Sequence, residues 1–210
     1  MVIKNKAVFL DRDGVINNMV YYQDHGLIDS PFLVKQFSIC PGVKEAIRLI
    51  HEMGMKAILV SNQPGIAKGF YSLKNLAMIN KKMNRLLNGA SSLDGMYYCL
   101  HHPEARIKKY KMACSCRKPK PGLLIKACRE NNVDLKRSYM IGDGITDIEA
   151  GKEAGCKTIL IGRPKCDLCS MLSSKGLKPD AIAGNLLEAV SKIKKWEGYD
   201  GDIHRHRRRK

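Results

Sequence analysis

Short apolar segments alternate with amphipathic ones along most of the chain. The amphipathic character is clear where Val43, Ile47 and Ile50 recur at helical spacing between Pro41 and Gly54. The segments expected as strands are 6–10, 56–61, 95–100, 138–142, 157–162 and, as a short one, 180–184. The segments expected as helices are 41–54, 72–88, 122–132, 147–155 and 185–196. This alternation predicts an α/β fold in which helices cover both faces of a mainly parallel sheet.

Length and composition favour one domain without a membrane span. The chain has 210 residues, of which 44% are hydrophobic, and this is enough for one sizeable core. No Gly, Ser or Pro-rich linker divides it, so residues 1–197 are expected to form a single domain. The apolar runs fall short of the roughly 20 residues that a membrane span needs, and the first residues lack a signal-peptide pattern. A cytoplasmic location is therefore expected.

Polar side chains follow three of the predicted strands. In open parallel sheets, ligands bind beyond the carboxyl ends of the strands, where neighbouring loops converge. One such residue after a strand is commonly a turn former, but three endings of this kind favour a shared site. The residues concerned are Asp11 and Asp13, Ser61 and Asn62, and Asp143 and Asp147.

These residue types suit phosphoryl transfer. Converging carboxylates repel one another unless a cation lies between them, and oxygen ligands of this kind suit Mg²⁺, which also binds substrate phosphate. Asp11 can attack phosphorus to form an aspartyl phosphate, while Asp13 can protonate the departing alcohol and later take a proton from water. Ser61 and nearby backbone amides can donate to the phosphoryl oxygens. This chemistry also requires a cation from the protein.

The segment "CSCRKPKPG", residues 114–122, supplies that cation. Lys118 precedes a predicted helix, so its ammonium can point at the same edge of the sheet, and Arg117 beside it can bind phosphate with two parallel hydrogen bonds. Two solvated basic residues are the alternative. The neighbouring prolines and cysteines favour an ordered loop.

Four motifs together resemble those of the haloacid dehalogenase (HAD) superfamily of phosphatases. They are "FLDRDGVIN", "VSNQPGIAKG", "CRKPKPG" and "MIGDGITD", and the resemblance covers nearly all of residues 6–162. Within the superfamily the chain is most similar to the D-glycero-D-manno-heptose 1,7-bisphosphate 7-phosphatases, which also resemble histidinol-phosphate phosphatases. The resemblance implies a Rossmann-like three-layer α/β/α sandwich without a large cap domain.

The resemblance also implies roles for individual residues. Asp11 would be the nucleophile and Asp13 the general acid and base, with Ser61 and Lys118 stabilising the phosphoryl group. The Mg²⁺ ligands would be Asp11, Asp13 through its carbonyl, and Asp143. The implied substrate-binding residues are Asn62, Gln63 and Arg117.

A second metal site is predicted in the loop before Arg117. Cys99, His101, Cys114 and Cys116 read as C-x-H followed by C-x-C, the ligand set of a closed tetrahedral zinc site. The long polar loop between the two pairs would be ordered by such an ion. The resemblance agrees, because both phosphatase families carry a zinc loop here. His102 is the alternative imidazole.

The remaining cysteines are expected to be ordinary. Cys166 and Cys169 have C-x-x-C spacing but no partner pair, so a plain loop is favoured over zinc or redox chemistry. Cys40, Cys128 and Cys156 lie in apolar contexts typical of core residues.

The sequence departs from the best-known heptose phosphatase pattern in two places. The segment between Asn17 and Pro41 is longer, and Gly144 stands where a lysine is often found. The longer segment lies where the family places substrate-recognition residues. Specificity depends on such loop contacts, so substrate identity is the least securely transferred property.

The charge of the chain raises a competing class of function. The formal net charge is +17, and the C-terminal "HRHRRRK" contributes five positive charges. Residues 198–210 are expected to be a disordered basic tail. A nucleic-acid-binding module would combine such charges with stacking aromatics, yet aromatics make up only 6% of the chain. Nucleic acid is therefore the less favoured partner.

The favoured function is a Mg²⁺-dependent phosphomonoester hydrolase that acts through an aspartyl phosphate. Its expected substrate is a small phosphorylated sugar, heptose 1,7-bisphosphate, cleaved at the 7-phosphate in nucleotide-heptose biosynthesis. Histidinol phosphate and the 3′-phosphate of a nucleic acid are the alternative substrates. Mg²⁺ and Zn²⁺ are the expected cofactors, and a monomer is expected.

Overall fold

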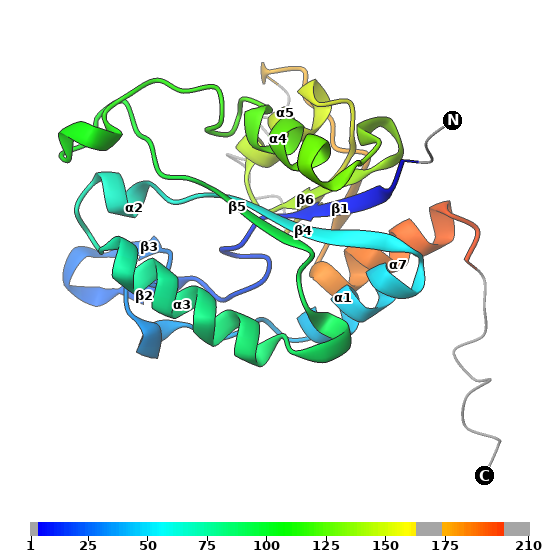
Figure 1. Ribbon diagram of the computed structural model, residues 1–210, viewed down its shortest axis with the longest axis horizontal. Helices are drawn as coiled ribbons and strands as arrows, with labels where there is room; N and C mark the ends of the chain where they lie inside the picture. Colours follow the sequence, from blue (N-terminus) through cyan, green and yellow to red (C-terminus); the bar gives the residue numbers. More distant parts are fainter. Residues whose placement is uncertain (1–3, 163–173, 200–210) are drawn as a thin grey trace, which may run out of the picture.

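A parallel six-stranded sheet forms the centre of the molecule. The computed structural model describes residues 4–162 and 174–199, and the sheet order is β5-β4-β1-β6-β7-β8 (Figure 1). Every neighbouring pair in this sheet is parallel. The strands are β1 (Lys6–Leu10), β4 (Met55–Asn62), β5 (Gly95–Cys99), β6 (Tyr139–Gly142), β7 (Lys157–Ile161) and β8 (Ala181–Ala183).

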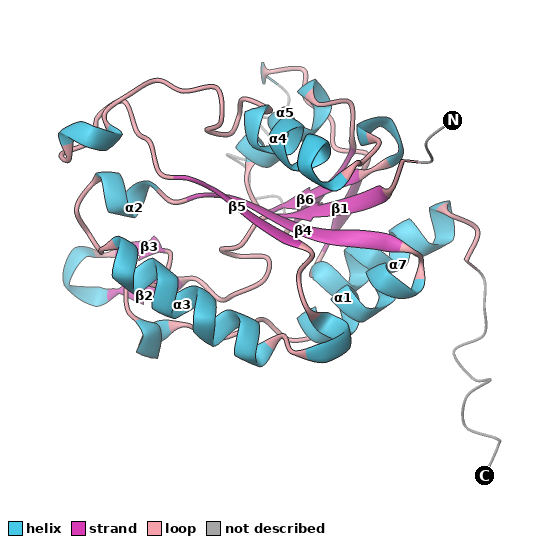
Figure 2. Cartoon of the chain, viewed as in Figure 1, coloured by secondary structure: helices cyan, strands magenta, loops and turns pink. Residues whose placement is uncertain are grey.

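Helices cover both faces of this sheet, as Figure 2 shows, so the predicted three-layer α/β/α arrangement is confirmed. One face carries α1 (Val43–Glu52), α3 (Leu73–Leu86) and α7 (Leu186–Trp196). The other face carries α4 (Gly122–Asn131) and α5 (Ile145–Glu153). The two largest hydrophobic clusters lie between the three layers, and a smaller one lies between α5 and β7.

The central strand β1 explains why its sequence is apolar without alternation. Val8 and Leu10 pack into the core under α1 and α7, whereas Ala7 and Phe9 pack into the core under α4. A strand buried on both faces has no solvent side on which to place polar residues. Its last residue, Leu10, pairs with β4 on one side and β6 on the other. The residues that follow all three strands therefore emerge together.

All of the predicted strands and helices are present. Three further short elements that lie wholly within the described residues were not predicted. They are the antiparallel hairpin of β2 (Val20–Tyr22) and β3 (Leu27–Asp29), and the helix α2 (Pro64–Ala67). Each is only three or four residues long, too short to show a period in the sequence. Single turns of 3-10 helix also occur at Gln23–His25 (η1), Val34–Gln36 (η2), Gly89–Ser91 (η3), Lys108–Tyr110 (η4) and Leu135–Arg137 (η5).

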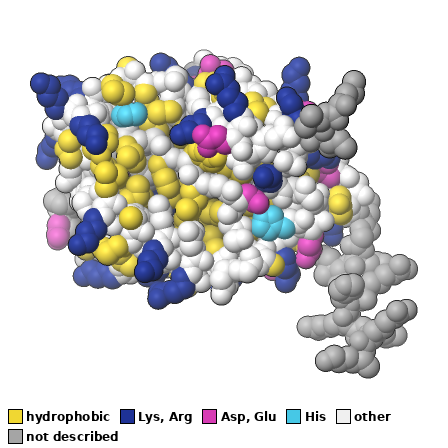
Figure 3. All heavy atoms as spheres, in the orientation of Figure 1, with side chains coloured by type: hydrophobic (Ala, Val, Ile, Leu, Met, Phe, Trp, Pro, Cys, Tyr) yellow, Lys and Arg dark blue, Asp and Glu magenta, His cyan; other side chains and the backbone are white. Residues whose placement is uncertain are grey.

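The surface mixes apolar and basic side chains. Figure 3 shows hydrophobic side chains in the half of this face that holds α2 and α3, with Lys and Arg around them. None of the helices within the described residues is both long and apolar enough to cross a bilayer.

Three sequence expectations concern cysteines and the tail. Cys156 is buried in the core as predicted, whereas Cys40 and Cys128 are only half-buried. Cys166 and Cys169, and the tail from residue 200 onward, lie outside the described residues.

Candidate active site

Three carboxylates meet at the carboxyl edge of the sheet. Asp11 follows β1, Asp143 follows β6, and Asp147 lies in the first turn of α5. Each offers an oxygen atom, and these atoms all lie within 4.8 Å of one another. The structure thus brings together Asp11 and Asp143, two of the sequence-predicted metal ligands, and adds Asp147 to them.

Gly14 allows this close approach. Its φ of 79° lies in the left-handed region, and a Cβ added there would overlap the carboxylate of Asp143. A glycine directly behind the two aspartates of "DRDG" is therefore required by the neighbouring acid.

The electrostatics of the cluster fit a divalent cation. Burial by the surrounding protein and the negative charges of Asp11 and Asp147 raise the pKa of Asp143 to about 7. Burial also raises the pKa of Asp147, even though it is paired with Lys118. These raised pKa values reflect burial together with repulsion between carboxylates that would all be ionised. A cation that prefers oxygen ligands relieves this repulsion, so the donor set fits Mg²⁺.

Lys118 lies at the centre of the site and is 2% exposed. Its ammonium is 2.9 Å from Oδ1 of Asp11 and 2.5 Å from Oδ1 of Asp147, and it donates to the carbonyl of Val60 at 2.9 Å. Burial alone would lower the pKa of Lys118, but the two carboxylates outweigh burial and raise it. The lysine therefore stays charged beside the expected nucleophile.

Asp147 is the acid that positions Lys118, a role that sequence reasoning missed. Its side chain is buried; Oδ1 pairs with Lys118, and Oδ2 accepts from the backbone N–H of Gly144 at 3.1 Å. That second bond is typical of an acidic residue in the first turn of a helix. The signal was available, because Asp147 stands three residues after Gly144 where a helix begins.

Asn62 clamps the backbone of Lys118. Its Oδ1 accepts from the Lys118 N–H at 3.1 Å, and its Nδ2 donates to the Lys118 carbonyl at 2.9 Å. The resemblance implied substrate binding for Asn62, but here both ends of the amide bind the lysine-bearing loop. The loop after Cys116 is thereby attached to the end of β4.

Asp13 is surrounded by donors. Its carboxylate accepts from Arg12, from Nδ2 of Asn17 at 3.0 Å and from Nε2 of Gln63 at 2.7 Å. Gln63, another implied substrate residue, is 1% exposed, and its Nε2 also donates to Oγ of the buried Ser61 at 3.1 Å. The structure therefore places Gln63 behind Asp13 and Ser61.

The four predicted zinc ligands form a second cluster. Sγ of Cys116 lies 3.3 Å from Sγ of Cys99 and 3.2 Å from that of Cys114, and 3.5 Å from Nδ1 of His101. Zinc–sulfur bonds of about 2.3 Å place tetrahedral thiolates less than about 4 Å apart, so the set fits zinc. Burial alone would raise the pKa of Cys114, but bonds from its neighbours lower it to about 6, toward the thiolate that a metal requires.

His102, the alternative imidazole, points elsewhere. Its Nδ1 accepts from the N–H of Glu104 at 3.1 Å, and it is outside the ligand cluster. Arg117 follows the last ligand directly, and its Nη1 lies 3.5 Å from the carbonyl of His101. The zinc cluster and the basic residues thus share one loop.

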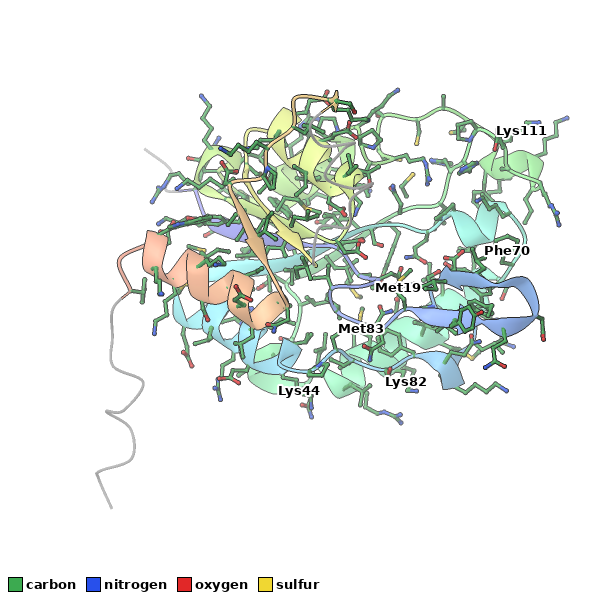
Figure 4. All side chains as sticks on the ribbon, turned by 180° about the vertical axis from the view of Figure 1, so that it is seen from behind. Met19, Lys44, Phe70, Lys82, Met83 and Lys111 are labelled. Atoms are coloured by element: carbon green, nitrogen blue, oxygen red, sulfur yellow. The ribbon has the colours of Figure 1, made fainter. Side chains whose placement is uncertain are left out.

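The hairpin and the zinc loop border a hollow. Its volume is about 520 Å³, and it is lined by Tyr22, Leu27, Phe32, Phe70 and Arg106. Tyr22 and Phe32 stack with ring centroids 4.5 Å apart. Figure 4 shows Phe70 beside the hairpin, with Lys111 at the outer end of the zinc loop. The longer segment after Asn17 therefore forms one wall of this hollow.

Comparison with known proteins gives consistent results. A HAD-hydrolase-like family model matches residues 115–189. The D-glycero-beta-D-manno-heptose-1,7-bisphosphate 7-phosphatase of Haemophilus ducreyi is 38% identical over 188 residues, covering 88% of this chain and 96% of the relative. The protein of that name from Pasteurella multocida is 41% identical over 163 residues, covering 76% and 84%.

Solved structures agree with these relatives. The crystal structure of D,D-heptose 1,7-bisphosphate phosphatase from B. bronchiseptica, complexed with magnesium and phosphate, has a TM-score of 0.73 and 27% identity. The match covers 91% of this chain and 99% of that one. A putative HAD-like phosphatase from Mesorhizobium loti has a TM-score of 0.71 and 27% identity, with coverage of 90% and 88%.

Proposed function

Because this chain belongs to the D-glycero-beta-D-manno-heptose-1,7-bisphosphate 7-phosphatases, a family of HAD phosphatases, we propose that it hydrolyses the 7-phosphate of that sugar through an aspartyl phosphate. One observation supports the chemistry above all: Asp11 lies beside a buried cation, Lys118, at the meeting point of three carboxylates. Such a site binds a phosphoryl group and supplies an attacking oxygen to it.

In the first half of the reaction, the carboxylate of Asp11 attacks phosphorus. Lys118 holds Oδ1 of Asp11 and offsets the negative charge that gathers on the phosphoryl oxygens. The bond between phosphorus and the sugar oxygen breaks, and Asp13 gives its proton to that oxygen. The products are the sugar alcohol and phosphorylated Asp11.

In the second half, a water molecule attacks the phosphoryl group. Asp13, now a carboxylate, takes a proton from that water, and the bond between phosphorus and Asp11 breaks. Inorganic phosphate leaves and Asp11 is restored. One residue thus serves as acid and then as base, so its orientation matters in both halves.

Asp11, Asp143 and the carbonyl of Asp13 are the residues proposed to hold Mg²⁺, with Asp147 behind them. When bound, Mg²⁺ neutralises the carboxylates and binds a phosphate oxygen. The magnesium and phosphate in the B. bronchiseptica structure support this assignment. The raised pKa of Asp143 indicates the local excess of negative charge that such an ion would relieve.

Cys99, His101, Cys114 and Cys116 are proposed to hold zinc in a structural role. Three thiolates and one imidazole leave no open position for a substrate. The ion would order the loop that ends in Arg117 and Lys118, and thereby place both cations against the phosphate. Arg117 is proposed to contact the substrate directly.

Substrate identity rests on the relatives. They support heptose 1,7-bisphosphate over histidinol phosphate and over a 3′-phosphorylated nucleic acid. We also propose that the enzyme acts as a monomer, since every group in this mechanism comes from one chain. Analytical ultracentrifugation at assay concentration tests that point.

Phosphate release from three substrates tests the function. We expect kcat/KM for heptose 1,7-bisphosphate to exceed that for histidinol phosphate and for a 3′-phosphorylated oligonucleotide by at least about 100-fold. The variant Asp11→Asn should lose more than about 99% of activity, because an amide is a poor nucleophile, whereas Asp24→Asn on the exposed hairpin should retain it. A preference for another substrate would change the substrate assignment, and an active Asp11→Asn would contradict the mechanism.

A further inference from the structure

Arg12, between the two catalytic aspartates, is completely buried. Its Nη2 lies 3.1 Å from both carboxylate oxygens of Asp13, its Nε lies 3.2 Å from Oδ1, and Nη2 also donates to Oε1 of Gln63 at 2.8 Å. Its Nη1 is buried without a hydrogen-bond partner among the described residues. A buried guanidinium with an unused donor is costly for folding. This arrangement favours a role for Arg12 other than stabilising the fold.

Gln63 completes the contact between Arg12 and Asp13. Its Oε1 accepts from Arg12 and from the hydroxyl of Tyr71, while its Nε2 donates to Asp13 and to Ser61. This network fixes the direction of the amide, because the reverse orientation would set its NH2 group against the guanidinium of Arg12 and its oxygen against the carboxylate of Asp13. Both polar atoms of the Gln63 side chain are thus in use within the protein.

An outer layer of tyrosines supports this pair. Tyr71 follows α2, and its ring stacks near Phe32 with centroids 5.5 Å apart. The guanidinium of Arg12 lies 6.0 Å from the ring centre of Tyr98, whose hydroxyl donates to Asn80 at 2.8 Å. The network is anchored in β5 and α3, outside the catalytic loops. It is therefore a rigid support behind one side chain.

We propose that Arg12 and Gln63 are positioning residues that orient Asp13 for both of its proton transfers, with Tyr71 fixing Gln63. This inference rests on the proposed function, in which Asp13 protonates the sugar oxygen and later deprotonates water. Asn17 holds Oδ1 of Asp13 from another direction, so Arg12, Asn17 and Gln63 restrict the rotation of the carboxylate. Misorientation would slow every step that moves a proton and leave the attack by Asp11 unaffected.

Substrates with different leaving groups distinguish the attack by Asp11 from the proton transfer by Asp13. A sugar alkoxide must be protonated as it leaves, whereas 4-nitrophenolate departs without a proton. In the variant Gln63→Met, which keeps the length but removes the amide, we expect kcat on heptose bisphosphate to fall at least about 100-fold, within the range of general acid catalysis. The first turnover of 4-nitrophenyl phosphate should change less than about threefold.

The second half-reaction supplies an independent signature. Hydrolysis of the aspartyl phosphate needs Asp13 for either substrate, so steady-state turnover of 4-nitrophenyl phosphate should fall as well. We therefore expect Gln63→Met to release one equivalent of 4-nitrophenolate in a rapid burst and then slow down. The variant Asp13→Ala should show the same burst and serves as the positive control.

A smaller substitution controls for loss of activity through misfolding. Tyr71→Phe removes only the hydroxyl that fixes Gln63, and it should show the same pattern with a smaller loss of about tenfold on the sugar. Tyr97→Phe is the matched control, because that hydroxyl accepts from Asn131 on the far side of β5 and should leave the kinetics unchanged.

Two results would overturn the proposal. Equal losses in first-turnover and steady-state rates on both substrates would mean that the network is only structural. A raised KM with unchanged kcat would mean that Gln63 binds substrate. If the wild type cleaves 4-nitrophenyl phosphate but not heptose bisphosphate, only the substrate assignment fails, and the comparison is then run with an alkyl phosphate that the wild type does cleave.

Discussion

The ammonium of Lys118 lies 2.9 Å from the carboxylate of Asp11, although the two residues come from segments far apart in the chain. Asp147 holds the lysine from behind and Asn62 holds its backbone. The attacking group and the charge that assists it are therefore placed as one unit before substrate arrives. Such preorganisation is the usual source of large electrostatic effects in catalysis.

Removing the buried ammonium should impair catalysis more than binding. We expect Lys118→Met to lower kcat at least about 100-fold, because one preorganised donor to developing charge is lost. The exposed neighbour Lys120 provides the control, and Lys120→Met should keep kcat within about threefold. Lys118→Met leaves Asp11 and Asp147 without their cationic partner, which can destabilise the fold. Circular dichroism is therefore used to check that the variant is folded. A kcat close to the wild type would remove Lys118 from the mechanism.

The metal-free protein should lose stability as the pH rises. The pKa of Asp143 is about 7 in the fold, against an ordinary value near 3.8, so the folded state binds the proton more tightly than the unfolded state. The free energy of unfolding then falls between about pH 4 and 7. Thermal unfolding in EDTA measures this slope, and Asp143→Asn should make it shallower. An unchanged slope in that variant would exclude Asp143 as its source.

Magnesium should reverse this trend. Mg²⁺ competes with the proton for Asp143, so its stabilising effect is expected to be larger at pH 8 than at pH 5.5. The measurement is the rise in Tm on adding Mg²⁺ at each pH. An equal rise at both values would place the ion away from Asp143.

Gly14 should be intolerant of any side chain. Gly14→Ala would introduce a Cβ that overlaps Asp143 at a residue with a φ of 79°, so the acid must move. We expect a loss of Mg²⁺ affinity of at least about tenfold, as seen when the support of a metal ligand is disturbed. Gly26 also has a positive φ, 57°, but it has open space around it. Gly26→Ala therefore measures the effect of backbone strain without steric overlap. Similar Mg²⁺ affinities in both variants would contradict the role of Gly14.

Zinc should be lost when a thiolate is replaced, and activity should fall with it. Cys114→Ser is expected to contain less than one zinc per chain and to lose at least about tenfold in kcat/KM, while its Mg²⁺ dependence persists. His102→Ala is the matched control, because that imidazole lies outside the cluster and the zinc content should stay complete. Elemental analysis and kinetics on the same samples decide the matter. Loss of zinc from His102→Ala would mean that His102, and not His101, is the zinc ligand.

The sequence predicted the residues of the site better than their contacts. Strand ends at Asp11, Ser61 and Asp143 follow from periodicity, because parallel strands place their last residues at one edge. The local pattern "CSCRKPKPG" carries no information about which acidic side chain contacts Lys118. The pairing of Lys118 with Asp147 was therefore not predicted. Asn62 and Gln63 were expected to face substrate, but their amides bind Lys118 and Asp13. Side-chain direction depends on packing partners that lie far away in sequence.

The hairpin between Asn17 and Pro41 was missed for a different reason. Tyr21 and Ile28 are about 60% exposed although both are large and apolar, so the sequence of these strands does not alternate between apolar and polar residues. Their pairing instead depends on the stack of Tyr22 with Phe32 and on the bond from Tyr22 to the carbonyl of Ser30. Periodicity detects a core, whereas these contacts of Tyr22 are with the segment that directly follows the hairpin.

The central place of β1 affects how the nascent chain matures on the ribosome. β1 precedes the other strands of the sheet in the chain, and its neighbours β4 and β6 begin only at Met55 and Tyr139. Until β6 emerges, one edge of β1 lacks its native partner, and the face that packs against α7 stays incompletely covered until residue 196, the condition in which incomplete chains aggregate. Truncated translation products that end before Asp147 also lack an acid of the metal cluster. Such fragments therefore combine exposed apolar strands with an incomplete metal cluster.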